Sequence, residues 1–271
     1  MNHVPSNSRG TLTFVSSKAE IGEDLRSLNP IGGKQRVRLM LTCLVDSFFG
    51  EVGIASVRVL EHAGCEVLFD KDQTCCGQPP FNSGDWTAAR QAAGFTMRAL
   101  LEHPEPVVAP SGSCSAMVRE GYPMLYEGMH HPLVFELSEF LVHQLKISEW
   151  KVTVKTLPAR RKIALHRACH GRAIGLKDEQ AMLVSSLPWI EMMEFGQQEQ
   201  CCGFGGAFCA THNSISAGIG MEKLHNIVDS GAEEIVSGDM GCLLHLNGLI
   251  KRHKIPLSTR HFAELLAEGI A

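Results

Sequence analysis

Short apolar runs alternate with longer amphipathic segments along most of the chain, beginning near residue 37. The runs resemble buried parallel strands in length and composition, and they predict strands at 37–41, 65–69, 107–109, 162–165, 190–195 and 234–236. The segments between and after them have helical spacing of apolar residues, and they predict helices at 47–64, 85–103, 136–145, 177–187, 215–230 and 261–268. Strands and helices that alternate in this order predict an α/β fold with mostly parallel strands.

Two adjacent cysteines followed by a glycine occur twice in the chain, at 75–77 and at 201–203. Eight of the ten cysteines form two sets, which are Cys43, Cys75, Cys76 and Cys114 in the first half and Cys169, Cys201, Cys202 and Cys242 in the second. In both sets 31 residues separate the first cysteine from the adjacent pair. The fourth cysteine follows the pair after 37 residues in the first set and after 39 in the second. This spacing indicates an internal duplication, and we expect two similar, Rossmann-like lobes.

The duplication suggests where the chain divides. We predict an N-terminal extension at 1–36, a first cysteine-rich lobe with a linking helix at 37–150, and a second lobe at 151–271. The extension is rich in Ser, Asn and Gly and lacks the apolar core of a secretory signal. Its composition is typical of a mobile segment.

The cysteines of the first set follow predicted strands, and those of the second set do so in the same order. We therefore expect them in loops beyond the strand ends, where ligands collect in parallel α/β sheets. The two remaining cysteines have no counterpart in the other half. Cys65 begins the apolar run 65–69, where a thiol usually serves as a small buried hydrophobic group. Cys209 follows the second pair closely in a glycine-rich segment, and we leave it out of the ligand set.

Composition narrows the possible functions. The chain has 271 residues, of which 44% are hydrophobic and 20% charged, and its net charge is −4. This balance gives no basic excess for binding nucleic acid, and no apolar run reaches the roughly 18 to 20 residues of a membrane-spanning helix. We expect a cytoplasmic protein, in which ten cysteines point to metal or redox chemistry more than to disulfides.

Four thiolates that converge from three loops can bind a tetrahedral zinc ion or an iron–sulfur cluster. Structural zinc sites favour Cys-x-x-Cys pairs, and this sequence contains none. Adjacent cysteines direct two sulfurs away from one loop, which suits two irons of one cluster better than one small ion. The glycine after each pair lets backbone N–H groups approach cluster sulfurs. We therefore expect iron–sulfur clusters, of the 4Fe-4S type, with zinc as the alternative.

Several longer motifs resemble those of a known family. They are 41–46 (LTCLVD), 74–79 (TCCGQP), 110–114 (PSGSC), 136–141 (ELSEFL) and 201–206 (CCGFGG). The repeated unit resembles the CCG or cysteine-rich domain that occurs twice in one of the subunits of heterodisulfide reductase. The motifs together resemble the lactate utilization protein A family from about Val37 to the C-terminus. The resemblance implies an iron–sulfur subunit of a complex that oxidises L-lactate to pyruvate, with a ferredoxin-like iron–sulfur subunit and a third lactate-utilisation protein as partners.

The sequence departs from the family's repeat at one point in each half. The full repeat ends in Cys-x-x-Cys, but Ser111 and Asp239 stand where the first of these two cysteines is expected. A carboxylate can bind iron, so Asp239 is a candidate fifth ligand, whereas the alcohol of Ser111 is less suited. Capping of the local backbone is the alternative for both residues.

Two further side chains near Cys169 have candidate roles. His166 could bind metal, support the ligands or carry protons, although most loop histidines are only solvated or hydrogen-bonded. Arg172 could neutralise cluster charge or bind a carboxylate substrate.

The sequence contains no G-x-G-x-x-G motif after a predicted strand, so it gives no sign of a nicotinamide or flavin site. The first hypothesis is therefore electron transfer within a larger oxidoreductase. Reduction of a thiol or disulfide substrate at a cluster is a second hypothesis. A non-catalytic zinc scaffold that holds partner subunits together is a third.

Overall fold

The computed structural model describes residues 34–101, 103–127 and 132–271. Most of the predicted extension at 1–36 lies outside these residues, and the first strand begins at Gln35. Within the described ranges, every helix is too short or too polar to cross a membrane.

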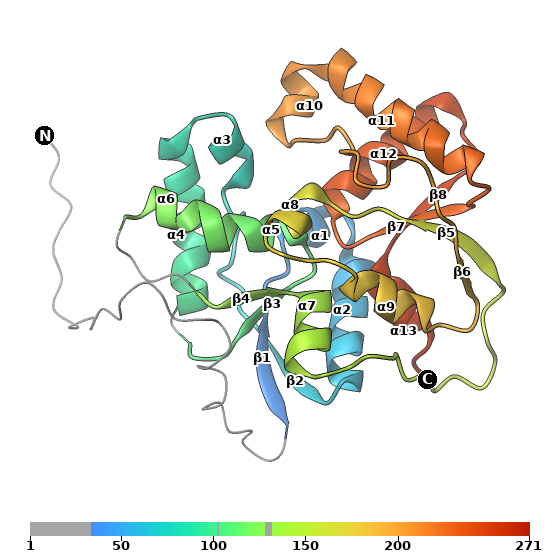
Figure 1. The fold of residues 1–271 in the computed structure, drawn as a ribbon. Helices are drawn as coiled ribbons and strands as arrows, with labels where there is room; N and C mark the ends of the chain where they lie inside the picture. The colour runs from blue at the N-terminus through green and yellow to red at the C-terminus, as the bar shows by residue number, and fades with distance from the viewer. Residues whose placement is uncertain (1–33, 102, 128–131) are drawn as a thin grey trace, which may run out of the picture.

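Among the described residues, eight parallel strands form two sheets of four strands each. Figure 1 shows how these strands are arranged. The strands are β1 (Gln35–Leu39), β2 (Cys65–Phe69), β3 (Val107–Ala109), β4 (Val134–Glu136), β5 (Arg161–Leu165), β6 (Ile190–Met192), β7 (Glu234–Ser237) and β8 (Ser258–His261). Their order is β2-β1-β3-β4 in the first sheet and β6-β5-β7-β8 in the second. The two sheets therefore share one topology, which confirms the predicted α/β fold with two Rossmann-like lobes.

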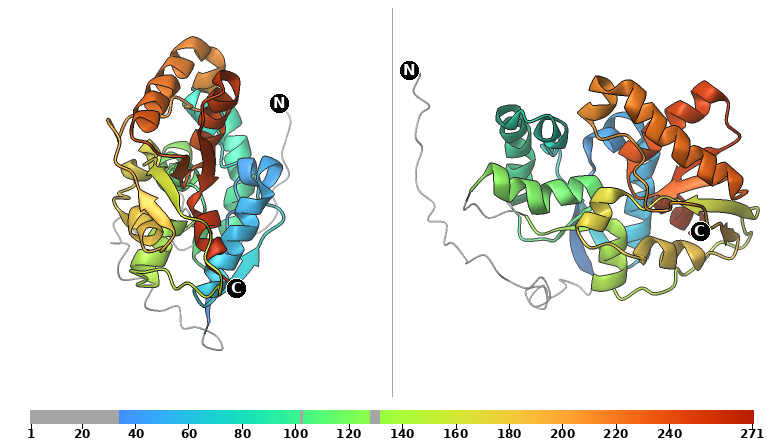
Figure 2. Two further views of the ribbon diagram at one scale, coloured as in Figure 1. Left: turned by 90° about the vertical axis from the view of Figure 1, so that its right-hand side faces the viewer. Right: turned by 45° about the horizontal axis from the view of Figure 1, so that its top comes forward.

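Helices follow nearly every strand. Those of the first half are α1 (Cys43–Phe48), α2 (Gly50–His62), α3 (Gln78–Asn82), α4 (Trp86–Leu101), α5 (Gly112–Ala116), α6 (Tyr122–Leu125) and α7 (Leu137–Glu139), with π-helical turns η3 (Met117–Gly121) and η4 (Phe140–Gln144). Those of the second half are α8 (Cys169–Ala173), α9 (Glu179–Ser185), α10 (Ala207–Thr211), α11 (Asn213–Asp229), α12 (Met240–His253) and α13 (Phe262–Glu268). Figure 2 shows the first half, in blue and green, beside the second half, in yellow to red.

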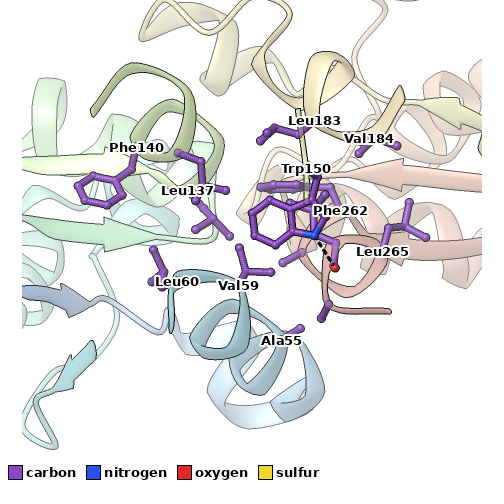
Figure 3. Packing of buried hydrophobic residues seen from close by; sticks show 14 of the residues in the cluster. Ala55, Val59, Leu60, Leu137, Phe140, Trp150, Leu183, Val184, Phe262 and Leu265 are labelled. Carbon is purple, nitrogen blue, oxygen red and sulfur yellow. Dashed lines mark hydrogen bonds between the residues drawn. The ribbon is translucent and has the colours of Figure 1, made fainter. Parts of the chain in front are cut away.

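The two halves share a hydrophobic core. Helix α2 of the first half packs against α13 of the second, and Val59 and Phe262 are buried in the same cluster of side chains (Figure 3). Trp150 lies in this cluster, and its indole N–H donates a hydrogen bond of 2.9 Å to the Leu266 carbonyl. Cys65 is buried there too, as expected of a small hydrophobic residue. The shared core holds the carboxyl ends of the two sheets in a fixed relation.

The last strand of each sheet runs into a helix through the same kind of cap. Glu136 at the end of β4 accepts hydrogen bonds from the backbone of α7, and Glu139 bonds back to the Glu136 N–H. His261 at the end of β8 caps α13 with Glu264 in the equivalent way. Both capping boxes satisfy N–H groups that the helices leave without partners.

Candidate metal centre

All eight cysteines of the two predicted sets line a single cavity of about 160 Å³. Residues of both halves line this cavity, including Cys114 of α5 and Cys169 of α8. These two helices pack against each other where the halves meet (Figure 1). The two helices pack closely at their glycines. A Cβ atom added to Gly112 of α5 would lie only 3.0 Å from the Gly171 Cα of α8. The structure thus brings the two sets to one place, whereas the sequence predicts only that four sulfurs converge in each lobe.

Four of the cysteines lie in the first turns of helices that follow central strands, and not in loops as predicted. Cys43 and Cys169 are the first residues of α1 and α8, and Cys114 and Cys242 are the third residues of α5 and α12. Backbone N–H groups and the helix dipole favour negative charge at such positions. Neighbouring thiols and burial oppose this effect, and they raise the pKa of Cys43 and Cys169.

The adjacent pairs occupy loops, as predicted. Cys76 and Cys202 are buried, and their thiols contact the fourth cysteine of their own set. The sulfur of Cys76 lies 3.5 Å from that of Cys114, and the sulfur of Cys202 lies 2.9 Å from that of Cys242. Cys201 is the most exposed of the eight. Each pair therefore has one sulfur deep in the protein and one nearer its surface.

Thiols within each set share protons. A hydrogen bond from Cys43, with one from Cys76, lowers the pKa of the Cys75 thiol to about 3. The hydrogen bond to Cys75, together with burial, raises the pKa of Cys43 above its usual range. In the second set the pKa of Cys201 is lowered and that of Cys169 raised by the same kind of bond. Complete deprotonation of four close sulfurs needs positive charge between them, which a bound metal supplies.

The glycine after each cysteine pair lets the loop backbone pack against a neighbouring helix more closely than any other residue would permit. Gly77 and Gly203 have φ of 86° and 90°, in the left-handed region. A Cβ atom would lie 2.8 Å from the Ala89 carbonyl oxygen at Gly77 and 2.4 Å from that of Ser216 at Gly203. In this conformation the Gly77 N–H lies 3.4 Å from the Cys75 sulfur and the Gly203 N–H lies 3.3 Å from the Cys201 sulfur. These N–H groups donate to the sulfurs.

Asp239 and Ser111 are helix caps in the structure, which is the alternative that the sequence leaves open. Ser111 Oγ accepts from the Cys114 N–H at 3.2 Å and caps α5. Asp239 Oδ1 accepts from the Gly241 N–H at 3.1 Å and caps α12. Both residues also line the cavity, so a ligand role for Asp239 stays a prediction.

His166 and Lys223 are buried beside the second set. His166 is 1% exposed, and one ring nitrogen forms a group with the sulfurs of Cys202 and Cys242 in which all three atoms lie within 4.8 Å of one another. Burial lowers the pKa of His166 to about 3, which keeps the imidazole neutral. Lys223 on α11 donates to the Gln200 carbonyl at 2.9 Å, and burial lowers its pKa to about 8. The sequence gives no signal for Lys223, because a lysine on an amphipathic helix is normally exposed.

The remaining candidates have structural roles. Arg172 donates to the Glu199 carbonyl at 2.7 Å and pairs with the Glu199 carboxylate at 3.2 Å, just before the second cysteine pair. Cys209 is not among the residues that line the cavity, and its thiol donates to the Gly206 carbonyl at 3.0 Å. Its omission from the ligand set stays a prediction.

The side chains around the cavity suit a group bound by thiolates. The eight cysteines line it. His166 lies beside Cys202 and Cys242, and its buried ring nitrogens have no hydrogen-bond partner among the described residues. Soft sulfur donors with one imidazole are typical of zinc and of iron–sulfur clusters. The donor set therefore fits both groups that the sequence predicts.

Fold and site together define an α/β protein with a duplicated cysteine-rich unit. The family model described as "CCG: Cysteine-rich domain" matches the chain twice, at 37–119 and at 163–247. Over 246 residues the chain is 36% identical to lactate utilization protein A 2 of Bacillus cereus (strain Q1), which covers 87% of this chain and 99% of the relative. It is 37% identical over 241 residues to lactate utilization protein A of Geobacillus kaustophilus, covering 85% and 98%. The chain belongs to the lactate utilization protein A family, as its motifs predict.

A solved structure supports the fold alone. A hypothetical protein from Helicobacter pylori superposes with a TM-score of 0.57 at 11% sequence identity and covers 92% of this chain. The chain spans about half of that protein, 53% of its length.

Proposed function

We propose that this protein acts in lactate utilization as an iron–sulfur subunit that passes electrons within a complex oxidising L-lactate to pyruvate. The observation that carries the proposal is the convergence of both cysteine sets on one cavity. The names of the relatives, lactate utilization protein A, support the pathway. Its partners would be a ferredoxin-like iron–sulfur subunit and a third lactate-utilisation protein.

In this proposal the eight cysteine thiolates hold the iron, and the cluster supplies one-electron chemistry. The protein contributes the rest. Helix N-termini and the N–H groups of Gly77 and Gly203 stabilise negative charge on the sulfurs. Because the two sets border the same cavity, the groups that they bind would be neighbours, which suits transfer of electrons between them.

A reducing compartment is part of the proposal. Cysteines bind metal only as reduced thiolates, and glutathione and thioredoxin keep thiols reduced in the cytosol. This supports a cytoplasmic location.

Anaerobic purification tests the proposal directly. Iron and acid-labile sulfide should be present in comparable amounts, and visible absorption should bleach on reduction while an electron paramagnetic resonance signal changes. A variant with Cys75→Ser and Cys201→Ser is the matched control and should lack most of the iron. Protein that contains zinc but neither iron nor sulfide would contradict the proposal.

A zinc scaffold is the second candidate function. The observation that favours it is the group of His166, Cys202 and Cys242, since mixed imidazole and thiolate donors are typical of structural zinc sites. Metal analysis of the same anaerobic preparation distinguishes the two functions.

A further inference from the structure

We propose that the two cysteine sets bind metal in different ways, with His166 as an additional ligand in the second set only. The metal held by the second set is bound through a ring nitrogen of His166 as well as by thiolates. The first set binds through sulfur. The inference deepens the proposed function, on which it rests for the identity of the metal as iron.

The first argument is the burial of His166 without partners. Its side chain is 1% exposed, and neither Nδ1 nor Nε2 has a hydrogen-bond partner among the described residues. A buried polar atom without a partner destabilises the folded state, so such atoms are rare in native proteins. A metal bound by one ring nitrogen would give this imidazole the partner that it lacks.

The second argument is distance. The ring nitrogen and the sulfurs of Cys202 and Cys242 all lie within 4.8 Å of one another. Bonds of about 2.0–2.3 Å to one tetrahedral ion place neighbouring ligand atoms roughly 3.3–3.8 Å apart, and ligands of neighbouring irons in one cluster lie farther apart. Small side-chain rotations would bring the three atoms to either arrangement. The two sulfurs are already closer, at 2.9 Å, and would separate slightly around an ion.

The third argument comes from the equivalent place in the first half. Met40 follows β1 directly as His166 follows β5. The Met40 N–H donates to the Val108 carbonyl of β3 at 2.9 Å, and the His166 N–H donates to the Val236 carbonyl of β7 at 2.7 Å. The two residues therefore occupy the same position in the two sheets.

Met40 shows what the fold alone requires at this position. It is 1% exposed and packs in one hydrophobic cluster with Cys76 and Cys114, the counterparts of Cys202 and Cys242. An apolar side chain thus fills the space beside the first set. The fold does not need an imidazole there, so the histidine of the second half adds a donor, and not merely volume.

Pulsed electron paramagnetic resonance of the reduced protein tests the inference, because it measures magnetic coupling between the cluster and the nitrogen nuclei of its ligands. Wild-type protein is prepared with natural and with ¹⁵N-labelled histidine, and the nitrogen couplings are compared. We expect a strong coupling that changes with the histidine label. The coupling should vanish in His166→Met, which copies Met40 of the first half, and in His166→Gln, which serves if the methionine variant does not fold.

Two control variants make the test specific. Met40→Leu changes the equivalent position of the first half and should keep the coupling. His170→Gln removes a histidine that lines the cavity and should keep the coupling too. A histidine coupling that survives in both His166 variants overturns the inference, and so does a wild-type cluster signal without any strong histidine coupling.

The same variants separate this inference from the proposed function. If the purified protein holds zinc and no iron, the proposed function fails, and the role of His166 is then measured with Co²⁺ in place of zinc. The cobalt absorption bands should shift and the affinity for the metal should fall about 10-fold or more in His166→Gln, with Met40→Leu unchanged. Equal spectra and affinities in the wild type and His166→Gln would overturn the inference.

Discussion

Asp239 Oδ2 in the second half accepts a hydrogen bond of 2.8 Å from the backbone N–H of Ser113 in the first half. Oδ1 of the same carboxylate accepts from the Gly241 N–H of its own helix. One side chain therefore satisfies the N-termini of α12 and α5, which carry Cys242 and Cys114. Asp239 links the two cysteine sets through hydrogen bonds and needs no metal to do so.

This relationship predicts different outcomes for two substitutions of Asp239. Asp239→Ala leaves the N–H groups of Ser113 and Gly241 without their acceptor, and should lower the free energy of unfolding by about 1–3 kcal/mol. Asp239→Asn keeps one accepting oxygen and should cost about 1 kcal/mol. Urea unfolding measures both. If Asp239 acts as a cap, iron content in Asp239→Asn stays at the wild-type value; loss of iron without loss of stability would instead identify a fifth ligand.

The sequence predicts much of the fold and the membership of each cysteine set. Regular spacing around the two cysteine pairs identifies all eight cysteines that line the cavity. The sequence does not predict how the two halves pack against each other. That relation depends on packing between α2 and α13, which are far apart in the chain and carry no mark of pairing.

The missed elements have individual physical reasons. Strand β8 (Ser258–His261) lies at the edge of the second sheet and consists of polar residues. The sequence therefore has no apolar run that would predict it. Around Cys242 the sequence predicts a loop where the structure has helix α12, because Gly241 and Asp239 suggest a turn. The spacing of Leu243, Leu246 and Leu249 is a helical signal that identifies this helix once it is considered.

Replacement of single cysteines should affect iron in one half at a time. Cys75→Ser and Cys201→Ser should each remove about half of the iron, because one thiolate of one set is lost. Cys65→Ser should leave the iron unchanged, since Cys65 is buried in the core shared by α2 and α13. Iron and sulfide per chain and the spin signal of each variant are the measurements. Equal loss from all three variants would contradict the assignment of the sets.

Gly77 and Gly84 of the first half can be compared to test whether close packing of the cysteine loop against α4 matters. Gly77 and Gly84 both have left-handed φ, 86° and 79°, so alanine should cost about 1–2 kcal/mol at either from the backbone alone. At Gly84 nothing lies within 4 Å of an added Cβ, but at Gly77 the Ala89 oxygen lies at 2.8 Å. Gly77→Ala should therefore be less stable than Gly84→Ala and should lose iron. Equal free energies of unfolding and equal iron contents in the two variants would show that the approach is unimportant.

The buried cation beside the second set should affect its reduction potential. Lys223 is 0% exposed and interacts with the charges of Cys202, Cys242 and Cys201. Beside the first set, the Thr96 hydroxyl donates to the Cys75 carbonyl, much as the Lys223 ammonium donates to the Gln200 carbonyl beside the second set. Thr96 carries no charge. Positive charge favours the reduced cluster, so the second set should have the higher potential.

Substitution of Lys223 tests this difference. Lys223→Gln keeps a donor for the carbonyls but removes the charge, and should lower the potential of the second cluster by about 50 mV, close to a tenfold change in the equilibrium constant for one electron. Lys223→Met removes charge and hydrogen bonds together and should lower it at least as far. Spectroscopic redox titration measures both. A potential that falls in Lys223→Met and stays constant in Lys223→Gln would assign the effect to hydrogen bonding.

Stability should depend on pH through the cap of α13. His261 is 0% exposed, its Nδ1 accepts from the Ala263 N–H at 3.2 Å, and burial lowers its pKa to about 4. The unfolded chain, with a histidine pKa of about 6.5, binds the proton more tightly. The free energy of unfolding should therefore fall as the pH decreases from 6.5 to 4, by up to about 3 kcal/mol from this residue. Above pH 6.5 His261 should contribute no pH dependence.

His261→Asn isolates this contribution, because the asparagine oxygen can accept from the Ala263 N–H but does not titrate. Its free energy of unfolding should fall less steeply than that of the wild type between pH 6.5 and 4. The exposed His253 provides the control, and His253→Asn should parallel the wild type. Urea unfolding at several pH values, with equal metal content in all three proteins, measures the slopes. Because the buried neutral form of His261 is the source of the difference, parallel curves for the wild type and His261→Asn would show that the cap does not control acid stability.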